Sequence, residues 1–314
     1  MLRWRGVESA PAGWGRCVVT VGVFDGVHRG HQEIIGRAVA RAAGEGLPSV
    51  VLTFDPHPSE VVRPGTHPPM LTSQRYKAEL LEGLGVDVMC VLPFTAAFSR
   101  LGPDEFTHAV LVEHLHAATV VVGENFRYGH KAAGDVVSLS AAGRRFGFTV
   151  DAVAVAGTGD TTWSSTYVRS CVDAGDVTRA ADALGRPHRV EGVVVRGDRR
   201  GHLLGYPTAN LEPLPWSAVP ADGIYAGHLV RGGGTALAAA VSIGTNPTFA
   251  GRERRVEAFV LDFDGDLYGE HVGVAFTARL RPTVRFDGEE ALREQMARDV
   301  EQTRELLLPG HPNG

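Results

Sequence analysis

The first half of the chain alternates short apolar runs with longer amphipathic stretches. Runs rich in β-branched residues, which favour strands, occur at positions 17–24, 49–54, 86–92, 119–122 and 148–155. Between and after them the spacing of apolar residues and the capping residues favour helices at 31–43, at 73–84, from about 103 onward and at 176–184. Strands and helices that alternate in this order predict an α/β domain of Rossmann type, with helices packed on a mainly parallel sheet.

The pattern changes after residue 185 to short strands separated by Gly, Pro and Asn. The expected strands lie at 188–195, 225–230, 236–243, 256–261 and 272–280. They predict an antiparallel β-barrel. From Gly288 to Leu308 apolar residues recur at spacings of three and four, which predicts one C-terminal helix packed on the barrel. Gly185 and Pro187 mark the expected boundary between two domains, residues 1–186 and 187–314.

Composition narrows the class of protein. The 314 residues are 44% apolar and 21% charged, and no apolar run approaches the length of a membrane span. The first residues show no signal-peptide pattern, and three widely spaced cysteines fit neither a disulfide framework nor a zinc site. A net charge of −5 argues against a nucleic-acid partner. We therefore expect a cytoplasmic protein that acts on small molecules.

Two histidines follow the first predicted strand, at a glycine-rich turn into a helix. In the segment 22–31, GVFDGVHRGH, the turn leaves backbone N–H groups and the positive helix end facing one point, which is typical of a phosphate site. His28 and His31 are three residues apart, so both rings can face a phosphate there. A pair of ordinary surface histidines is the alternative. The chain has no G-x-x-x-x-G-K-[ST] motif, and no G-x-G-x-x-G follows a strand, which disfavours a dinucleotide-binding oxidoreductase.

A second Gly- and Arg-rich stretch, residues 195–211, ends in Pro-Thr-Ala-Asn-Leu. Glycines allow close backbone approach to phosphates, and arginines supply charge. The alternative is an exposed hairpin loop with solvated arginines, and we expect a turn at Pro207–Asn210.

These segments resemble a known family. Residues 22–31 resemble the H-x-G-H nucleotidyltransferase motif in the form used by the bacterial bifunctional riboflavin kinase and FAD synthetase family, and residues 53–58, 122–129 and 164–169 agree in order and spacing. Segments 207–211, 222–225, 242–249 and 255–259 resemble the riboflavin kinase of the same family. The resemblance covers essentially the whole chain.

For the first domain, the resemblance implies an FMN adenylyltransferase that transfers adenylyl from ATP to FMN. The implied catalytic residues are His28, His31 and Arg169. The implied ATP-binding residues are Gly22, Phe24, Asp25, Gly26, His28, His31, Asn125, Ser164, Ser165, Thr166 and Arg169. The implied walls of the flavin pocket are Phe54, Pro56, His57, Pro58 and Phe126.

For the second domain, the resemblance implies a riboflavin kinase. Thr208 and Asn210 would bind Mg²⁺ on the ATP phosphates, and Glu257 would be the base for the 5′-hydroxyl of riboflavin. Gly197, Gly201 and Gly205 would approach the ATP phosphates. The implied partners are riboflavin, FMN and ATP, with neither nucleic acid nor membrane, and the oligomeric state stays open.

Two other interpretations remain open on the residues. One is a nucleotidyltransferase for a pantetheine or nicotinamide phosphate, because H-x-G-H alone does not name its substrate; the barrel with Pro-Thr-Ala-Asn argues against it. The other is a flavin-binding regulator with a decayed site, against which the intact His28, Arg169 and Glu257 argue. Tyr167 and His202 stand where the family often has Arg.

Overall fold

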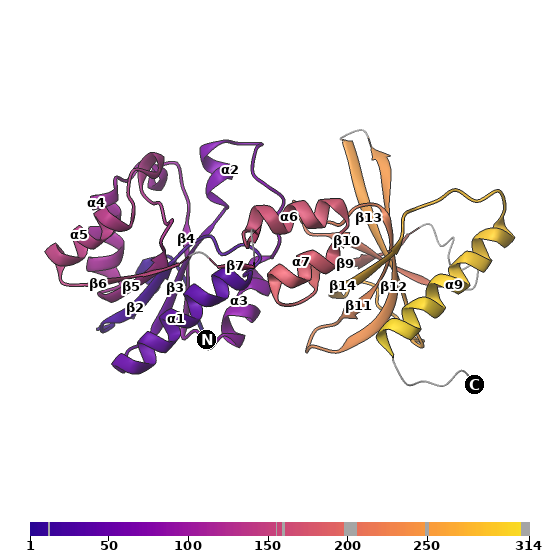
Figure 1. Ribbon diagram of the computed structural model, residues 1–314, viewed down its shortest axis with the longest axis horizontal. Helices are drawn as coiled ribbons and strands as arrows, with labels where there is room; N and C mark the ends of the chain where they lie inside the picture. Colours follow the sequence, from indigo (N-terminus) through magenta and orange to yellow (C-terminus); the bar gives the residue numbers. More distant parts are fainter. Residues whose placement is uncertain (12, 155, 159–160, 198–205, 249–250, 309–314) are drawn as a thin grey trace. The chain divides into compact units, whose positions relative to one another are not determined.

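The computed structural model describes residues 1–11, 13–154, 156–158, 161–197, 206–248 and 251–308. The chain forms two compact units (Figure 1). The first unit comprises Met1–Pro68 and Gln74–Ser164, and the second comprises Pro69–Ser73 and Ser165–Gly314. The second unit is therefore built from two separate stretches of the sequence.

A six-stranded parallel sheet forms the centre of the first unit, in the order β1-β4-β3-β2-β5-β6. Its strands are β1 Leu2–Arg5, β2 Cys17–Val21, β3 Ser49–Asp55, β4 Val88–Pro93, β5 Ala117–Gly123 and β6 Thr149–Val153. A small antiparallel pair follows, β7 Gly157–Thr158 and β8 Thr161–Thr162. The central strands are apolar on both faces, as expected of a sheet that is covered on both sides.

Helices cover both faces of this sheet. They are η1 Val7–Ser9, α1 Arg29–Glu45, α2 Pro58–Val62, α3 Gln74–Gly83, η2 Phe98–Arg100, α4 Pro103–Phe106, the π-helix η3 Thr107–His114, η4 His130–Ala132 and α5 Val136–Phe146. On one face, Ile35 of α1 and Leu81 of α3 pack on the sheet. On the other face, Leu111 of η3 and Leu139 of α5 pack on it. The unit is thus a three-layer α/β/α sandwich.

The order of the strands places a switch point beside β2. The chain runs from β2 through α1 to β3 on one side, whereas β5 lies on the other side of β2. In open parallel sheets ligands bind at the carboxyl ends of the strands, where the strand order reverses. The turns after β2, β3 and β5 meet at that edge.

A closed six-stranded antiparallel barrel forms the core of the second unit, in the order β10-β13-β12-β11-β14-β9. Its strands are β9 His188–Val195, β10 Thr208–Pro213, β11 Gly223–Val230, β12 Ala236–Thr248, β13 Gly251–Val260 and β14 His271–Arg281. Alternate residues such as Tyr225, Val241 and Ala258 are buried, as the period of two in a strand requires. Closure leaves the barrel no open sheet edge.

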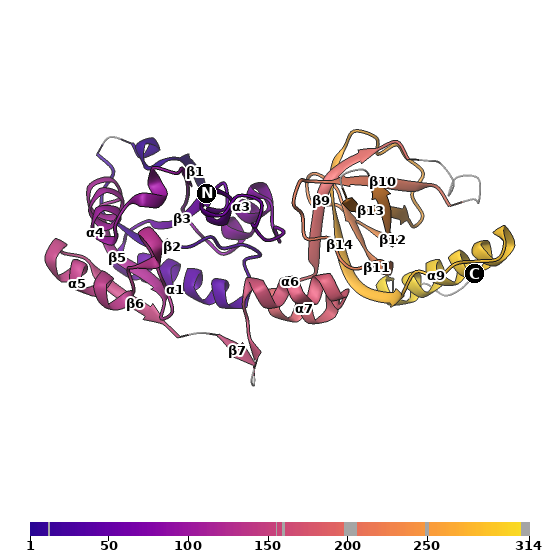
Figure 2. The ribbon, with the colours of Figure 1, turned by 90° about the horizontal axis from the view of Figure 1, so that it is seen from above.

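Among the described residues, three helices and one short segment complete the second unit. The helices are α6 Ser165–Ala174, α7 Val177–Leu184 and α9 Glu289–Leu307, and Figure 2 shows α9 lying along one side of the barrel. Val177 of α7 belongs to the buried cluster of the barrel. The segment Pro69–Ser73, which we call the strap, bonds to the barrel unit: Met70 pairs with Ser217, and the Ser73 hydroxyl donates to Glu191.

The predicted fold class is confirmed, with three differences in detail. Pro207–Asn210 is not a turn: Thr208 already pairs with β13, so β10 begins there. Several elements were not expected, among them β1, α2, α5 and α6, although Asp135 and Ser138 form a capping box at the start of α5. The sequence suggested a boundary at Gly185–Pro187, whereas the compact units divide before Ser165, because α7 packs on the barrel.

Candidate functional site

The turn from β2 into α1 has an unusual backbone. Phe24 has φ 49°, Val27 has φ 40° and Gly26 has φ 81°, so two side-chain-bearing residues adopt the left-handed region. A Cβ on Gly22 would lie 2.9 Å from Cζ of Phe24, so glycine leaves the space that the Phe24 ring occupies. Four predicted ATP-binding residues, Gly22, Phe24, Asp25 and Gly26, lie within this single turn.

The two predicted catalytic histidines stand together at the start of α1. His28 is the N-cap residue, and its Nδ1 accepts from the backbone N–H of His31 at 3.4 Å. Because Nδ1 is an acceptor, the hydrogen of the neutral ring lies on Nε2. The two rings stack with centroids 3.6 Å apart, and the Phe24 ring contacts His31 edge-on at 5.2 Å. The turn therefore aligns both imidazoles at a helix N-terminus, where anions bind.

Two predicted flavin-pocket rings lie at the neighbouring strand ends. Phe54 is the penultimate residue of β3, and Phe126 follows β5. Neighbouring rings with centroids 5.5 to 6.1 Å apart link them into one aromatic group, made of Phe54, Phe98, Phe106, Tyr128 and Phe126. Asn125 is exposed beside Phe126, with its Oδ1 3.0 Å from the position of a Cβ on Gly123. Its side chain thus lies over the end of β5.

The remaining predicted flavin residues begin α2. Pro56 follows β3, and His57 is the N-cap of α2, with its Nδ1 accepting from the Ser59 N–H at 3.1 Å. Pro58 is the first residue of the helix, where the absence of an N–H has no cost. All three are half-buried.

The Ser-Ser-Thr segment spans the junction between the units. Ser164 is the last residue of the first unit, whereas Ser165, Thr166 and Arg169 belong to α6 in the second. Nε of Arg169 donates to the carbonyl oxygen of Pro69 in the strap at 2.8 Å. Arg169 also lines a cavity of about 640 Å³ in the second unit, together with Arg254. The predicted phosphate ligand thus shares a cavity with a second guanidinium group.

The predicted kinase residues lie on two paired barrel strands. Thr208 and Asn210 are two residues apart in β10, so both side chains project from the same face. In the register of β10 and β13, Asn210 lies directly opposite Glu257. Ser242 of β12 is the next residue in that row. Register therefore brings together a hydroxyl, an amide and a carboxylate that are far apart in the sequence.

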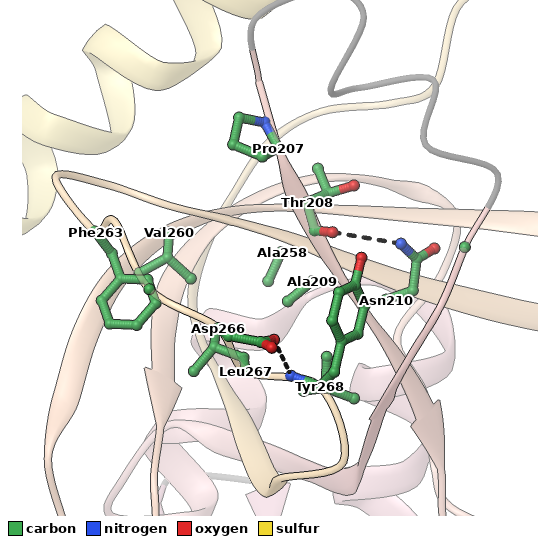
Figure 3. A pocket seen from close by; sticks show the side chains of 13 residues that line it. Pro207, Thr208, Ala209, Asn210, Ala258, Val260, Phe263, Asp266, Leu267 and Tyr268 are labelled. Carbon is green, nitrogen blue, oxygen red and sulfur yellow. Dashed lines mark hydrogen bonds between the residues drawn. The ribbon is translucent and has the colours of Figure 1, made fainter.

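One cavity, which we call the Asn210 cavity, has a volume of about 480 Å³ and is lined by Thr208, Asn210, Gly197, Asp266 and Tyr268, among others (Figure 3). Nδ2 of Asn210 donates to the Thr208 carbonyl oxygen at 3.5 Å, and Figure 3 shows the amide oxygen on the opposite side. A Cβ on Gly197 would lie 2.4 Å from the Asn210 amide. Glycine at position 197 therefore makes room for the Asn210 side chain.

A second cavity, the Glu257 cavity, has a volume of about 380 Å³ and lies between the barrel and α9. Its walls include Glu257, Thr208 and an aromatic pair, Tyr206 and Phe259, whose ring centroids are 5.2 Å apart. The side formed by α9 and the segment before it is mainly apolar, with Phe286, Leu292, Met296 and Val300, and Asp299 of α9 also lines the cavity. Thr208 lines both cavities.

An ion pair fastens α9 beside the Glu257 cavity. Nε and Nη2 of Arg281 donate to the two carboxylate oxygens of Asp299 at 2.9 and 2.7 Å. Gln295 also donates to Asp299, and the Arg281 guanidinium lies 5.8 Å from the centre of the Phe286 ring. The Asp299 side chain is only 7% exposed, so this pair is largely removed from water.

Sequence reasoning placed every flavin-binding residue in the first unit and none in the barrel. The ring of Phe259 lines the Glu257 cavity and was not among the predicted site residues, although it follows Glu257 by two residues and shares its strand face. The apolar stripe of α9 was recognised as a packing surface, but not as a wall of a cavity. The predicted residues Gly201 and Gly205 lie outside the described residues.

The oxygen donors fit a magnesium ion. Mg²⁺ prefers hard oxygen ligands, keeps several waters and completes its shell with substrate phosphates. Thr208 and Asn210 supply a hydroxyl and an amide oxygen on one strand face. Within the described ranges no cluster of three or more His, Cys, Asp or Glu side chains could hold a metal by itself. The donors thus suit a metal that arrives with a nucleotide.

Two family models match different parts of the chain. Residues 10–167 match the family model "FAD synthetase", and residues 184–307 match "Riboflavin kinase". The crystal structure of a macrolide-efflux protein from Streptococcus pneumoniae is 32% identical, with a TM-score of 0.87 over 97% of this chain and 99% of that one. Among the helices that the structure describes, none has both the length and the apolar character needed to cross a membrane.

Curated relatives match over nearly their full length. The bifunctional riboflavin kinase/FMN adenylyltransferase of Escherichia coli K12 is 36% identical, covering 93% of each chain. Those of Listeria monocytogenes and Pseudomonas fluorescens are each 38% identical and cover 91% and 97% of both chains, respectively. This chain therefore belongs to the bifunctional riboflavin kinase/FMN adenylyltransferase family and is an enzyme that makes FMN from riboflavin and FAD from FMN, with ATP as co-substrate.

Proposed function

We propose that residues 187–314 hold the kinase site and residues 1–186 the adenylyltransferase site. The observation that carries the kinase assignment is that Thr208, Asn210 and Glu257 meet on one face of paired strands, beside two cavities. For adenylyl transfer the support is the stacked pair of His28 and His31 at a helix N-terminus. Each proposed site thus lies in one compact unit, with Ser165, Thr166 and Arg169 as the exceptions.

In the kinase reaction the apolar Glu257 cavity would hold the flavin ring of riboflavin, against Tyr206, Phe259 and the α9 wall. The more polar Asn210 cavity would hold ATP. Because Thr208 lines both, the ribityl hydroxyl and the γ-phosphate would meet at β10. Glu257 would accept the 5′-hydroxyl proton while that oxygen bonds to the γ-phosphorus and ADP leaves.

Thr208 and Asn210 would hold Mg²⁺ through their side-chain oxygens. When bound, the ion neutralises charge on the ATP phosphates. The contribution of the chain is to fix the two oxygens on one strand face, and Gly197 leaves the Asn210 amide in place. Gly201 and Gly205 keep their proposed role as close backbone neighbours of the phosphates.

In adenylyl transfer an oxygen of the FMN phosphate bonds to the α-phosphorus of ATP and pyrophosphate leaves. No covalent enzyme intermediate is needed, so donors matter more than a nucleophile. His28 and His31 would donate to the phosphates, with Asn125, Ser164, Ser165, Thr166 and Arg169 as further ligands. The aromatic group that links Phe54 to Phe126, with Pro56, His57 and Pro58, would hold the flavin ring.

We also propose that the enzyme works in the cytoplasm without a nucleic-acid partner. All three cysteines are buried and free of disulfides, which suits a reducing compartment. The net charge of −5 disfavours a nucleic-acid surface.

Separated fragments test this division. A fragment ending at Arg186 should convert FMN to FAD but leave riboflavin unchanged. Two complementary fragments, starting at Ser165 and at Pro187, should make FMN and stop. The shorter of these lacks Val177, which fills part of the barrel core, so it should unfold at a lower temperature than the longer one.

The products are followed by chromatography, and each fragment must first show a cooperative thermal transition, because an unfolded fragment tests nothing. Both complementary fragments lack the strap, so their comparison isolates α6 and α7. Phosphorylation of riboflavin by a folded N-terminal fragment would overturn the division.

A further inference from the structure

Lys77 is a buried cation that the proposed sites leave unused. The chain has 31 Lys and Arg residues, of which only Lys77 and Lys131 are lysines. Lys77 projects from α3 and is 0% exposed. Burying an ammonium group is costly unless it is well bonded, so its neighbours should reveal what it does.

The Lys77 ammonium holds one backbone carbonyl. Nζ donates to the carbonyl oxygen of Val23 at 2.8 Å and lies 3.5 Å from Oγ1 of Thr53. That hydroxyl donates to the same carbonyl oxygen at 3.0 Å. A strand residue, Thr53, and a helix residue, Lys77, thus fix a carbonyl within the β2–α1 turn. The first turn of α3 is itself bonded to β3, because Gln74 donates to the Phe54 carbonyl at 3.1 Å.

The Val23 carbonyl belongs to the peptide that enters the left-handed residue Phe24. With φ 49°, this backbone is disfavoured for an aromatic residue and persists only if its surroundings hold it. The Phe24 ring lies over Gly22 and contacts the His31 ring, which stacks on His28. A continuous path of contacts therefore runs from the Lys77 ammonium to both imidazoles.

We propose that Lys77 is a positioning residue for adenylyl transfer, which clamps the Val23 carbonyl so that Phe24 holds His28 and His31 in line with the ATP phosphates. This inference rests on the proposed role of the two histidines. Lys77 itself acts through the turn and contacts no reacting atom.

The ionisation of Lys77 agrees with such a role. Burial lowers the pKa of Lys77 from 10.5 to about 8, and the carboxylates of Asp25 and Asp55, from the turn and the end of β3, act in the opposite direction. The unfolded chain therefore binds this proton more tightly between about pH 8 and pH 10.5. Below about pH 8 the buried charge lowers the free energy of unfolding by its full amount. This destabilisation decreases as the pH rises from about 8 to 10.5. Because the charged form of Lys77 destabilises the fold, a role in function explains its presence better than a role in stability does.

The decisive variant is Lys77→Met, which replaces the chain up to Cε with one of similar shape, removes the ammonium group and leaves the Thr53 hydroxyl to donate to the Val23 carbonyl. The kcat of FMN adenylylation should fall roughly 10²-fold, the effect of a small misplacement of catalytic groups, with little change in the KM for FMN. Riboflavin phosphorylation by the same chain should stay at its wild-type rate, and thermal stability should not fall. Lys131→Met is the matched control and should change neither activity.

The wild-type enzyme gives a second, independent readout. With ¹³C-labelled lysine the chain gives two side-chain signals, which Lys131→Arg assigns. The Lys77 signal should titrate near pH 8, and adenylylation should decline with the same midpoint, because a neutral amine makes a weaker hydrogen bond than an ammonium. The riboflavin kinase rate should not follow that titration.

Three results would overturn the proposal: full adenylylation by Lys77→Met, equal loss of both activities in that variant, or a wild-type adenylylation rate that stays flat through the Lys77 titration. A chain in which His28→Ala/His31→Ala also adenylylates normally would instead refute the proposed role of the histidines. The two failures are therefore distinguishable.

Discussion

The two candidate sites use the backbone in opposite ways. In the first unit, the histidines and the flavin-pocket residues lie at the ends of β2, β3 and β5 or in the turns and first helical residues that follow them. In the barrel, Thr208, Asn210 and Glu257 lie within regular strands. A turn fixes its side chains through special backbone angles and close glycine contacts, such as Gly22 against Phe24. A barrel fixes its side chains through strand register, so a shift of one strand would displace all of its residues relative to their partners on the neighbouring strand.

This difference predicts where each site is vulnerable. The turn site depends on a few positions with unusual φ and on the groups that hold them. The barrel site depends on strand pairing and on α9, which closes the Glu257 cavity. If the two sites are as independent as their construction suggests, a change in one should leave the other activity intact.

The largest separation should come from Glu257→Gln. The substitution is nearly isosteric and removes the proposed base, which typically contributes about 10² to 10⁴ in rate. Riboflavin phosphorylation should fall by that factor, while FMN adenylylation persists. Both rates are measured on the same preparation, and a kinase rate within a few-fold of wild type would show that Glu257 is not the base.

The converse change, His28→Ala with His31→Ala, should produce the next largest effect. Loss of a preorganised donor costs roughly 10² to 10³ in kcat, so riboflavin should accumulate as FMN with little FAD. Chromatography of the flavins after incubation with riboflavin, ATP and Mg²⁺ reads both steps at once. Undiminished FAD synthesis would remove the phosphate role of this turn.

A smaller effect is expected from Arg281→Met, which leaves the carboxylate of Asp299 without its bidentate partner. Breaking a buried ion pair costs about 3 to 5 kcal/mol, so the barrel should unfold at a lower temperature. Riboflavin phosphorylation should fall because α9 no longer packs firmly against the barrel. Adenylylation of supplied FMN should stay near wild type below that transition.

Arg304→Met is the matched control for this change. Arg304 also bonds both oxygens of an aspartate, Asp262, but that carboxylate is 63% exposed, so the thermal midpoint should hardly move. Equal loss of stability in the two variants would show that burial does not distinguish these pairs.

The sequence carries more of the local arrangement of the turn than of the barrel. Residues 22–31 are contiguous, so their chemistry could be recognised without knowing how strands pair. The kinase residues could be named only through resemblance, because alternation within β13 says which face Glu257 is on but not that Asn210 lies opposite it. The Glu257 cavity needed the position of α9 as well. Lys77 gave no signal in the amphipathic pattern of α3, since its partners belong to β3 and to the β2–α1 turn.

The strap carries a consequence for how the chain reaches its native state. Ser73 bonds to Glu191, a residue 118 positions later, so the barrel unit is completed only when an early segment closes a long loop of the chain. Loop-closure entropy must be overcome before such a contact stabilises anything, which slows folding. During synthesis on the ribosome, the α/β/α sandwich can fold before the barrel residues that the strap contacts have been made. The last strands to be synthesised therefore set the time at which both units are complete.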